Sequence, residues 1–177
     1  PGSICTTSGA IGTSRAAASG VYWCSRERKK VGGVMVPWAD GGIHVVAGDL
    51  MKAYACGADV VMLGSLLAGT DEGPGEVEPH PDTNLPVKVY RGMGSAEANK
   101  NKIRGYSKLP QGKSGYVEYR GSLYEWLPLM LDGLISAFKA HNIRSIPELH
   151  EAVYAGDIRF ENTTPGSRRE MGVHDLM

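Results

Sequence analysis

The sequence predicts an α/β fold in which short buried strands alternate with helices. Residues 34–39 and 59–63 are nearly continuous apolar runs bounded by glycines, the pattern of parallel strands that are buried on both faces. Between these runs, apolar residues at helical spacing predict a helix over residues 46–55. Strand, glycine-rich turn, helix and strand together define a βαβ unit.

Further helices are predicted on both sides of this unit. Residues 14–30 hold an alanine-rich stretch followed by alternating charges, whose basic part, residues 26–30, we interpret as the solvated face or end of a helix. Ser122 and Glu125 form a capping box before an amphipathic helix, and Pro128 predicts a kink or a helix start near it. The side chains of that helix expected in the core are Leu123, Trp126, Leu127, Met130, Leu131, Leu134, Ile135 and Phe138.

A second short helix follows, capped by Ser145, before a polar tail. Leu149, Ala152 and Val153 are expected to face inward from this helix. The tail, about residues 157–177, has too few apolar residues to fold alone.

The long middle region, about residues 73–121, predicts an inserted flap. It contains several prolines and only brief strand-like pieces such as residues 87–90. A structureless stretch of this length inside a compact domain is usually functional, so we expect a mobile lid over an active site; a disordered surface insertion is the alternative.

Two strands and about four helices cannot bury a parallel sheet on both faces. We therefore expect residues 1–177 to be one catalytic part, the C-terminal half of a larger α/β barrel whose N-terminal half is absent or is supplied by another chain.

Composition narrows the function classes. The 177 residues are 42% hydrophobic, enough for one domain with its own core. Lys plus Arg and Asp plus Glu number 19 each, which argues against nucleic acid or an anionic membrane as partner. No apolar stretch reaches the roughly 20 residues of a membrane span. Three cysteines without C-x-x-C spacing favour a reducing compartment, so we expect a cytoplasmic protein without a disulfide framework or zinc site.

The first seven residues predict a nucleophile. Cys5 lies among small residues and hydroxyls, including Thr6 and Thr7, and a thiol becomes nucleophilic only as thiolate, with nearby donors and partial exposure. The alternative is that Cys5 is a small buried hydrophobe. The five histidines show no ligand spacing, and none is assigned to a metal or to catalysis.

Several short motifs follow one another in a recognisable order. The sequence resembles the carboxyl-terminal half of inosine-5'-monophosphate (IMP) dehydrogenase and its relative guanosine-5'-monophosphate (GMP) reductase over nearly the whole chain. This resemblance implies the C-terminal half of a (β/α)8 TIM barrel with an inserted flap. The motifs that carry it are Gly2-Ser3-Ile4-Cys5-Thr6-Thr7, Ala39-Asp40-Gly41-Gly42, Met62-Leu63-Gly64-Ser65, Tyr90-Arg91-Gly92-Met93-Gly94-Ser95 and Glu170-Met171-Gly172-Val173-His174.

A nucleotide site follows from the resemblance and agrees with the chemistry of these residues. Backbone N–H groups of Gly41, Gly42, Gly64 and Ser65 at adjacent strand ends can hold a phosphate. Asp40 is expected to accept hydrogen bonds from the ribose hydroxyls, with a helix or turn cap as its alternative role. The resemblance further implies substrate contacts from Ser3, from Tyr90, Gly92, Met93 and Gly94, and from Gln111, which would face the purine.

The resemblance also implies a mechanism. Cys5 would add to C2 of the purine, hydride would pass to NAD, and water would hydrolyse the covalent intermediate, so that IMP becomes XMP in guanine nucleotide biosynthesis. Arg104 with Tyr106 best matches the family's hydrolytic pair, and Thr7 its auxiliary base. An ordinary surface arginine is the alternative for Arg104, because guanidinium is normally a fixed cation.

Two departures from the family pattern keep a rival open. Gly105 separates Arg104 from Tyr106, which the dehydrogenase pattern has adjacent, and the short flap is closer to the reductase. GMP reductase, which converts GMP and NADPH to IMP and ammonia, is therefore one alternative. An inactive nucleotide-binding fragment is another.

The resemblance finally implies a potassium ion and an assembly. Carbonyl oxygens suit such a weakly hydrated cation. They would come from Gly2 and Cys5 and from Glu170, Met171 and Gly172 of a neighbouring subunit in a homotetramer. A disordered tail is the alternative for the last three residues.

Overall fold

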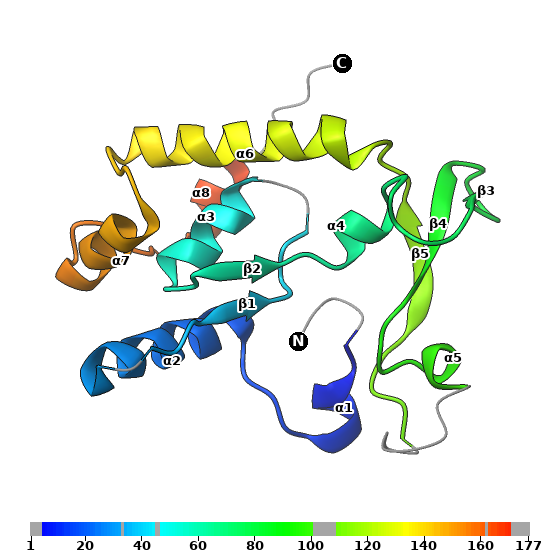
Figure 1. The fold of residues 1–177 in the computed structure, drawn as a ribbon, viewed down its shortest axis with the longest axis horizontal. Coiled ribbons are helices and arrows are strands. Elements are labelled where there is room, and N and C mark those ends of the chain that lie inside the picture. Colours follow the sequence, from blue (N-terminus) through cyan, green and yellow to red (C-terminus); the bar gives the residue numbers. More distant parts are fainter. Residues whose placement is uncertain (1–4, 33, 45–46, 101–108, 162, 171–177) are drawn as a thin grey trace.

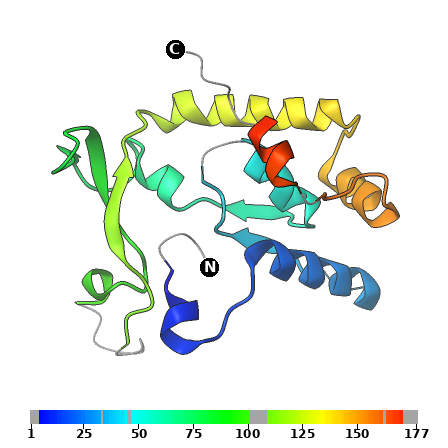
Figure 2. The same cartoon turned by 180° about the vertical axis from the view of Figure 1, so that it is seen from behind.

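The computed structural model describes residues 5–32, 34–44, 47–100, 109–161 and 163–170, without the side chains of 168–170. It is a mixed α/β structure with a two-stranded parallel sheet and a three-stranded antiparallel sheet (Figure 1). The predicted α/β class is therefore confirmed. Figure 2 shows the parallel sheet between α2 on one side and α3 and α6 on the other, with the antiparallel sheet standing beside them.

The predicted βαβ unit is present. β1 (Trp38–Asp40) and β2 (Val60–Met62) pair in parallel, with Asp40 opposite Met62, and α3 (Ala47–Ala55) connects them. Both strands are shorter than the apolar runs predicted. Val34 is fully exposed, and in the described part of the chain β1 pairs with β2 alone.

Three further helices lie around this unit. α1 (Thr7–Ile11) follows Cys5, α2 (Ala17–Val31) precedes β1, and α4 (Ser65–Ala68) follows β2. α2 ends at Gly32, whose φ of 65° is the left-handed conformation that favours glycine. Leu66 of α4 is 1% exposed and anchors this helix in the core.

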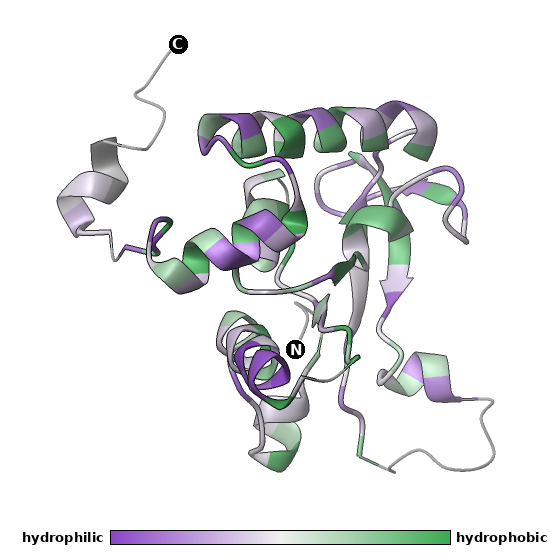
Figure 3. Ribbon diagram, turned by 60° about the vertical axis from the view of Figure 1, so that its left-hand side comes forward, coloured by the Kyte–Doolittle hydropathy of each residue, from purple (hydrophilic) through white to green (hydrophobic). Residues whose placement is uncertain are grey.

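The basic run lies at the end of α2, as predicted, and Figure 3 shows the hydrophilic colour there. Arg28 pairs with Asp59, and Lys30 lies 2.5 Å from Glu27. Cations in the last turn also complement the helix dipole. The ion pairs and the position in the last turn of α2 thus explain why this run is basic.

α6 (Leu123–Ala140) is the longest helix described and begins earlier than Pro128 suggested. Its first turn is anchored by Glu72, whose carboxylate accepts from the Leu123 amide at 2.8 Å and from the Ser122 hydroxyl at 2.7 Å. The predicted capping box is thus completed by Glu72 in place of Glu125. These bonds lower the pKa of Glu72.

The core is divided between α3, α6 and α7. Met130 packs with Ile43, Leu50 and Leu66, flanked by Trp126 and Leu134. In α7 (Ile146–Ala155), the predicted inward residue Leu149 is fully buried with Met51 and Ala55, and Ser145 caps the helix as expected. The prediction for Leu131 and Ile135 is wrong: they are 45% and 49% exposed, because only one edge of the α6 stripe meets α3.

The flap region is more regular than predicted. β3 (Val77–Pro79), β4 (Pro86–Arg91) and β5 (Ser114–Glu118) form an antiparallel sheet, and α5 (Ala96–Asn99) follows β4. The expectation of little regular structure is therefore wrong for these residues. Strand pairing places Pro79 opposite Pro86 at the strand ends, where a missing N–H is tolerated. Residues 101–108 lie outside the described residues.

A buried cation holds this sheet to the preceding loop. Lys88 in β4 is 2% exposed, and its ammonium donates to the carbonyl oxygens of Thr70 at 2.8 Å and Gly73 at 2.6 Å. The sequence did not single out this lysine. The available signal was the position of Lys88 between two valines in a strand-like run, Val87-Lys88-Val89.

The tail contains a short helix, α8 (Pro165–Glu170), where the sequence predicts no structure. None of the helices in the described ranges combines the length and apolarity that a membrane crossing requires.

Candidate active site

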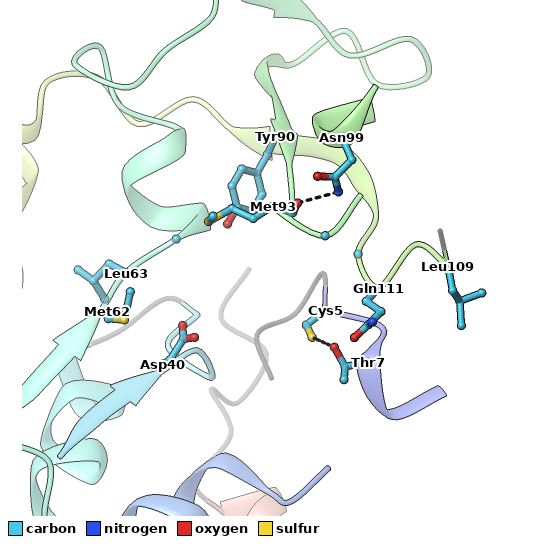
Figure 4. Close-up of a pocket in the computed structure, with 14 residues that line it drawn as sticks. Cys5, Thr7, Asp40, Met62, Leu63, Tyr90, Met93, Asn99, Leu109 and Gln111 are labelled. Carbon is cyan, nitrogen blue, oxygen red and sulfur yellow. Dashed lines mark hydrogen bonds between the residues drawn. The ribbon is translucent and has the colours of Figure 1, made fainter. Parts of the chain in front are cut away.

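A cavity of about 490 Å³ lies where the carboxyl ends of β1 and β2 meet the antiparallel sheet and the segment before α1 (Figure 4). This size is in the range of small-molecule sites. Its walls come from segments far apart in the sequence, and the lining residues are Cys5, Thr7, Asp40, Met62, Leu63, Gly64, Tyr90, Gly92, Met93, Gly94, Asn99, Leu109, Gln111 and Gly112.

The Cys5 thiol faces this cavity beside Thr7. Cys5 Sγ lies 3.0 Å from Thr7 Oγ1, and Cys5 is neither fully buried nor fully exposed. The Thr7 hydroxyl, and then the Thr7 backbone N–H, lower the pKa of Cys5, while burial and the charge of Asp40 act in the opposite direction. Cys5 is thus not the fully buried residue of the packing alternative, and it has the donors and access that a reactive thiol needs.

Asp40 lies across the cavity from Cys5, at the last residue of β1 (Figure 4). Its carboxylate is exposed at the carboxyl end of a parallel strand, where α/β proteins bind ligands. Burial is the main cause of the raised pKa of Tyr90, and the charge of Asp40 adds to it. Asp40 therefore offers hydrogen-bond acceptors to polar groups of a bound molecule.

Gly64 leaves room for Tyr90. A Cβ atom at Gly64 would lie 2.6 Å from the Tyr90 hydroxyl, closer than real Cβ contacts come. The tyrosine from β4 and the glycine after β2 thus form one continuous wall of the cavity. This contact joins the parallel and antiparallel sheets at the site.

The loop from Gly92 to Ser95 forms another wall and is held from behind by α5. Asn99 Nδ2 donates to the carbonyl oxygens of Met93 at 3.0 Å and Ser95 at 2.9 Å. Ser95 is fully buried and its hydroxyl accepts from the Ala98 amide, which caps α5. Met93 itself is 70% exposed, so an apolar side chain and ordered backbone groups lie at the cavity.

Gln111 reaches the cavity from the far end of the flap region, on the same side as Cys5 and Thr7 (Figure 4). Its backbone joins two neighbours, because Thr6 N–H donates to the Gln111 carbonyl at 3.0 Å and Gln111 N–H donates to the Gly94 carbonyl at 2.9 Å. Its amide side chain can both donate and accept.

The structure brings together most, but not all, of the predicted site residues that it describes. Ser65 begins α4 and does not line the cavity. Gly41 and Gly42 have φ of 86° and 82° and line a separate cavity of about 190 Å³ beside α2 and α3. The glycine turn after Asp40 is thus next to the site without forming its wall.

Other predicted residues lie outside the described residues: Gly2, Ser3, Arg104, Tyr106, Met171 and Gly172. Glu170 is the last residue of α8, and its side chain is not described. The hydrolytic pair and the potassium site therefore stay predictions. In the described ranges, no three His, Cys, Asp or Glu side chains gather as a metal site would require.

Five lining residues were missed by the sequence interpretation: Met62, Leu63, Asn99, Leu109 and Gly112. The position of Met62 and Leu63 at a strand's carboxyl end was an available signal. For Asn99 and Gly112 the sequence offered no signal, because their roles depend on backbone groups that the fold brings together.

The geometry is that of a mixed α/β protein in which a partly exposed thiol, in contact with Thr7, faces a cavity of small-molecule size. The chain belongs to the IMP dehydrogenase / GMP reductase family, whose domain model matches residues 1–174. Members of this family are oxidoreductases that act on IMP or GMP.

Curated relatives include both activities. Inosine-5'-monophosphate dehydrogenase of Chlorobaculum tepidum is 36% identical, over 100% of this chain and 36% of that protein. GMP reductase of Leishmania major is 37% identical, over 99% of this chain and 36% of that protein. The chain thus spans about a third of the length of these relatives.

A solved structure shows the same fold. It is a cysteine-to-alanine variant of GMP reductase from Trypanosoma brucei in complex with guanosine 5'-monophosphate. The two structures superpose with a TM-score of 0.85 at 35% identity, covering 100% of this chain and 35% of that chain.

Proposed function

We propose that this chain is the carboxyl-terminal catalytic part of an IMP dehydrogenase that converts IMP to XMP with NAD. The observation that carries the proposal is the Cys5 thiol, activated by Thr7 and facing Asp40 across a cavity of about 490 Å³. The parallel β1–α3–β2 unit would form part of a (β/α)8 barrel, of which this chain supplies the C-terminal half.

Each wall of the cavity has a role in this proposal. Asp40 accepts hydrogen bonds from the ribose hydroxyls, which places the base near Cys5. Backbone groups of Gly92, Met93 and Gly94, together with the Gln111 amide, bind the edge of the purine. Tyr90 and the neighbouring glycine Gly64 lie toward the phosphate end, as the family resemblance implies.

The reaction begins at Cys5. Its thiolate forms a bond to C2 of the purine, and the Thr7 hydroxyl, freed from the anionic sulfur, is placed to act on a water molecule in the second step. The exposed apolar side chains of Met93 and Leu109 suit a nicotinamide ring, and bound NAD supplies the acceptor of the hydride that leaves C2. Hydrolysis then releases XMP and returns the thiol.

Other parts of the proposal depend on the resemblance alone. Arg104 and Tyr106 are proposed to activate the hydrolytic water. A potassium ion is proposed to be held by carbonyls of Gly2 and Cys5 with those of Glu170, Met171 and Gly172 from a neighbouring subunit of a homotetramer. A cytoplasmic location agrees with three free cysteines.

GMP reductase is the second candidate, and a specific finding favours it. The solved relative holds GMP, and GMP reductases are as similar to this chain as the dehydrogenases. The same thiol and pocket would serve either reaction, since both change the bond at C2 of a purine nucleotide.

One spectrophotometric experiment separates the candidates. We expect the absorbance band of reduced nicotinamide to rise when the folded chain is mixed with IMP and NAD, whereas a fall with GMP and NADPH would identify the reductase. Cys5→Ser should abolish the change and the covalent nucleotide adduct in mass spectrometry, while Cys24→Ser, in the exposed face of α2, should preserve both. A folded chain that is inactive with both pairs would support the fragment alternative and overturn the proposal.

A further inference from the structure

Gly112 lies where three walls of the active-site cavity meet. It forms an antiparallel bridge with Cys5 on one side and a parallel bridge with Ser95 on the other. The adjacent residue, Gln111, bonds in the same two directions, to Thr6 N–H at 3.0 Å and to the Gly94 carbonyl at 2.9 Å. The segment 111–112 therefore joins the thiol segment to the Gly92–Ser95 loop through backbone alone.

A Cβ atom at either of two glycines in this junction would crowd the backbone. A Cβ atom at Gly112 would lie 2.9 Å from Ser95 N and 3.0 Å from the Gly94 carbonyl carbon. On the facing loop, a Cβ at Gly94 would lie 3.1 Å from both the carbonyl carbon and the oxygen of Gln111. The atoms met are backbone atoms, which cannot turn aside as a flexible side chain can.

The far side of the junction is rigid. Asn99 holds the carbonyls of Met93 and Ser95, and the Ser95 side chain is fully buried. Because the Gly92–Ser95 loop is anchored in this way, a side chain at position 112 would displace segment 111–112 toward Cys5. The bond from Thr6 N–H to the Gln111 carbonyl would then be lost or lengthened.

That bond fixes the turn in which the thiol is activated. Thr6 lies between Cys5 and Thr7, and the 3.0 Å contact between Cys5 Sγ and Thr7 Oγ1 depends on the turn of these three residues. Across the cavity, the titratable groups that line it are Asp40 and Tyr90.

We propose that Gly112 is a positioning residue, which sets the reactivity of Cys5 by allowing the purine-side loop and the thiol segment to share one backbone junction. The inference rests on the proposed role of Cys5 as nucleophile. The inference adds that the loop that would bind the purine also positions the Cys5 thiol. Gly112 links the two segments through its backbone.

The three cysteines provide the test. In the intact chain, iodoacetamide alkylation at neutral pH, followed residue by residue with mass spectrometry, reports Cys5 in the site, Cys24 on the exposed surface and Cys56 in the core. In Gly112→Ala we expect Cys5 alkylation to slow at least threefold, with Cys24 unchanged and Cys56 still protected. An unchanged or faster Cys5 rate in such a folded variant would overturn the proposal.

Two more variants keep the test independent of folding and of turnover. Gly94→Ala crowds the same junction less severely and should slow Cys5 alkylation by a smaller factor, even if Gly112→Ala fails to fold. Gly115→Ala, in β5 with nothing within 4 Å of its Cβ, is the matched control and should leave all three rates unchanged. Because no nucleotide or cofactor is added, these rates test the junction whether or not the proposed dehydrogenase activity is found.

Discussion

At the scale of single residues, the site depends on one short contact between Cys5 and Thr7. The Thr7 hydroxyl can donate to the sulfur, and this bond is the largest cause of the lowered pKa of Cys5. A lower pKa means a larger thiolate fraction at neutral pH, and the thiolate is the nucleophile. Thr7 therefore contributes to the first step of the proposed reaction before any water is involved.

Replacing Thr7 with valine tests this contribution. Thr7→Val keeps the shape and removes the donor, so the pKa of Cys5 rises and the thiolate fraction at neutral pH falls. We expect Cys5 alkylation to slow several-fold at pH 7 and to approach the unmodified rate at high pH, where the thiol is ionised in both proteins. The pH profile of alkylation measures this.

The matched control is Thr13→Val. Thr13 is exposed, and its hydroxyl donates to the Ile11 carbonyl away from the thiol. Its profile should match that of the unmodified chain. If Thr7→Val also matched it, Thr7 would have no part in activating Cys5.

Sequence interpretation placed four side chains that the structure brings to one cavity. Cys5 and Asp40 were predicted from residue type and motif, and Tyr90 and Gln111 from the family resemblance. Asn99 was missed, because it acts on backbone carbonyls whose positions exist only in the folded loop.

At the scale of elements, helical spacing located α6 and α7 but did not decide which side of each stripe is covered. Met130, in the predicted stripe, is 6% exposed and Leu129, outside it, is 71% exposed, as the spacing predicts. Leu131 and Ile135 belong to the same stripe but are 45% and 49% exposed. Figure 3 shows hydrophobic and hydrophilic residues alternating along α6, and only part of its apolar stripe packs against α3.

A pair of neighbouring substitutions measures this difference. Met130→Ala removes a side chain packed on Ile43, Leu50 and Leu66, and should lower the free energy of unfolding by about 2–5 kcal/mol. Leu129→Ala, in the same turn, should change it by less than about 0.5 kcal/mol. Urea unfolding followed by circular dichroism gives both values. Equal losses would contradict the burial difference.

The antiparallel sheet was missed for a different reason. β3, β4 and β5 are short, and prolines at the strand ends hide the alternation that marks a strand. Their pairing joins residues up to 31 positions apart, as between Val87 and Glu118, which no local pattern reports.

At the scale of the whole molecule, one buried histidine makes stability depend on pH. His150 is 7% exposed and lies 3.2 Å from the Ala58 carbonyl. Burial lowers the pKa of His150 below its usual 6.5, although the nearby Asp59 charge opposes this. As pH falls below about 6.5, the unfolded chain takes up this proton more readily than the folded one, so folding stability is lost.

His150→Gln removes the titration and keeps a donor for the Ala58 carbonyl. We expect the unmodified chain to lose more unfolding free energy between about pH 7.5 and pH 5.5 than this variant does, measured by urea unfolding at both values. Glu72 and Glu97 are carboxylates with lowered pKa, so their titration changes folding stability only below about pH 4.5, outside this pH range. His141→Gln, on the exposed surface, should show the same loss as the unmodified chain, and no difference among the three would contradict the role of His150.

The buried ammonium of Lys88 has a consequence for chemical labelling. Its N–H groups are directed at the carbonyls of Thr70 and Gly73, and reagents in solution cannot reach it. Acylating reagents such as acetic anhydride would modify exposed lysines such as Lys139 first. The extent to which Lys88 is acetylated therefore reports how often the strand β4 separates from the loop that follows α4.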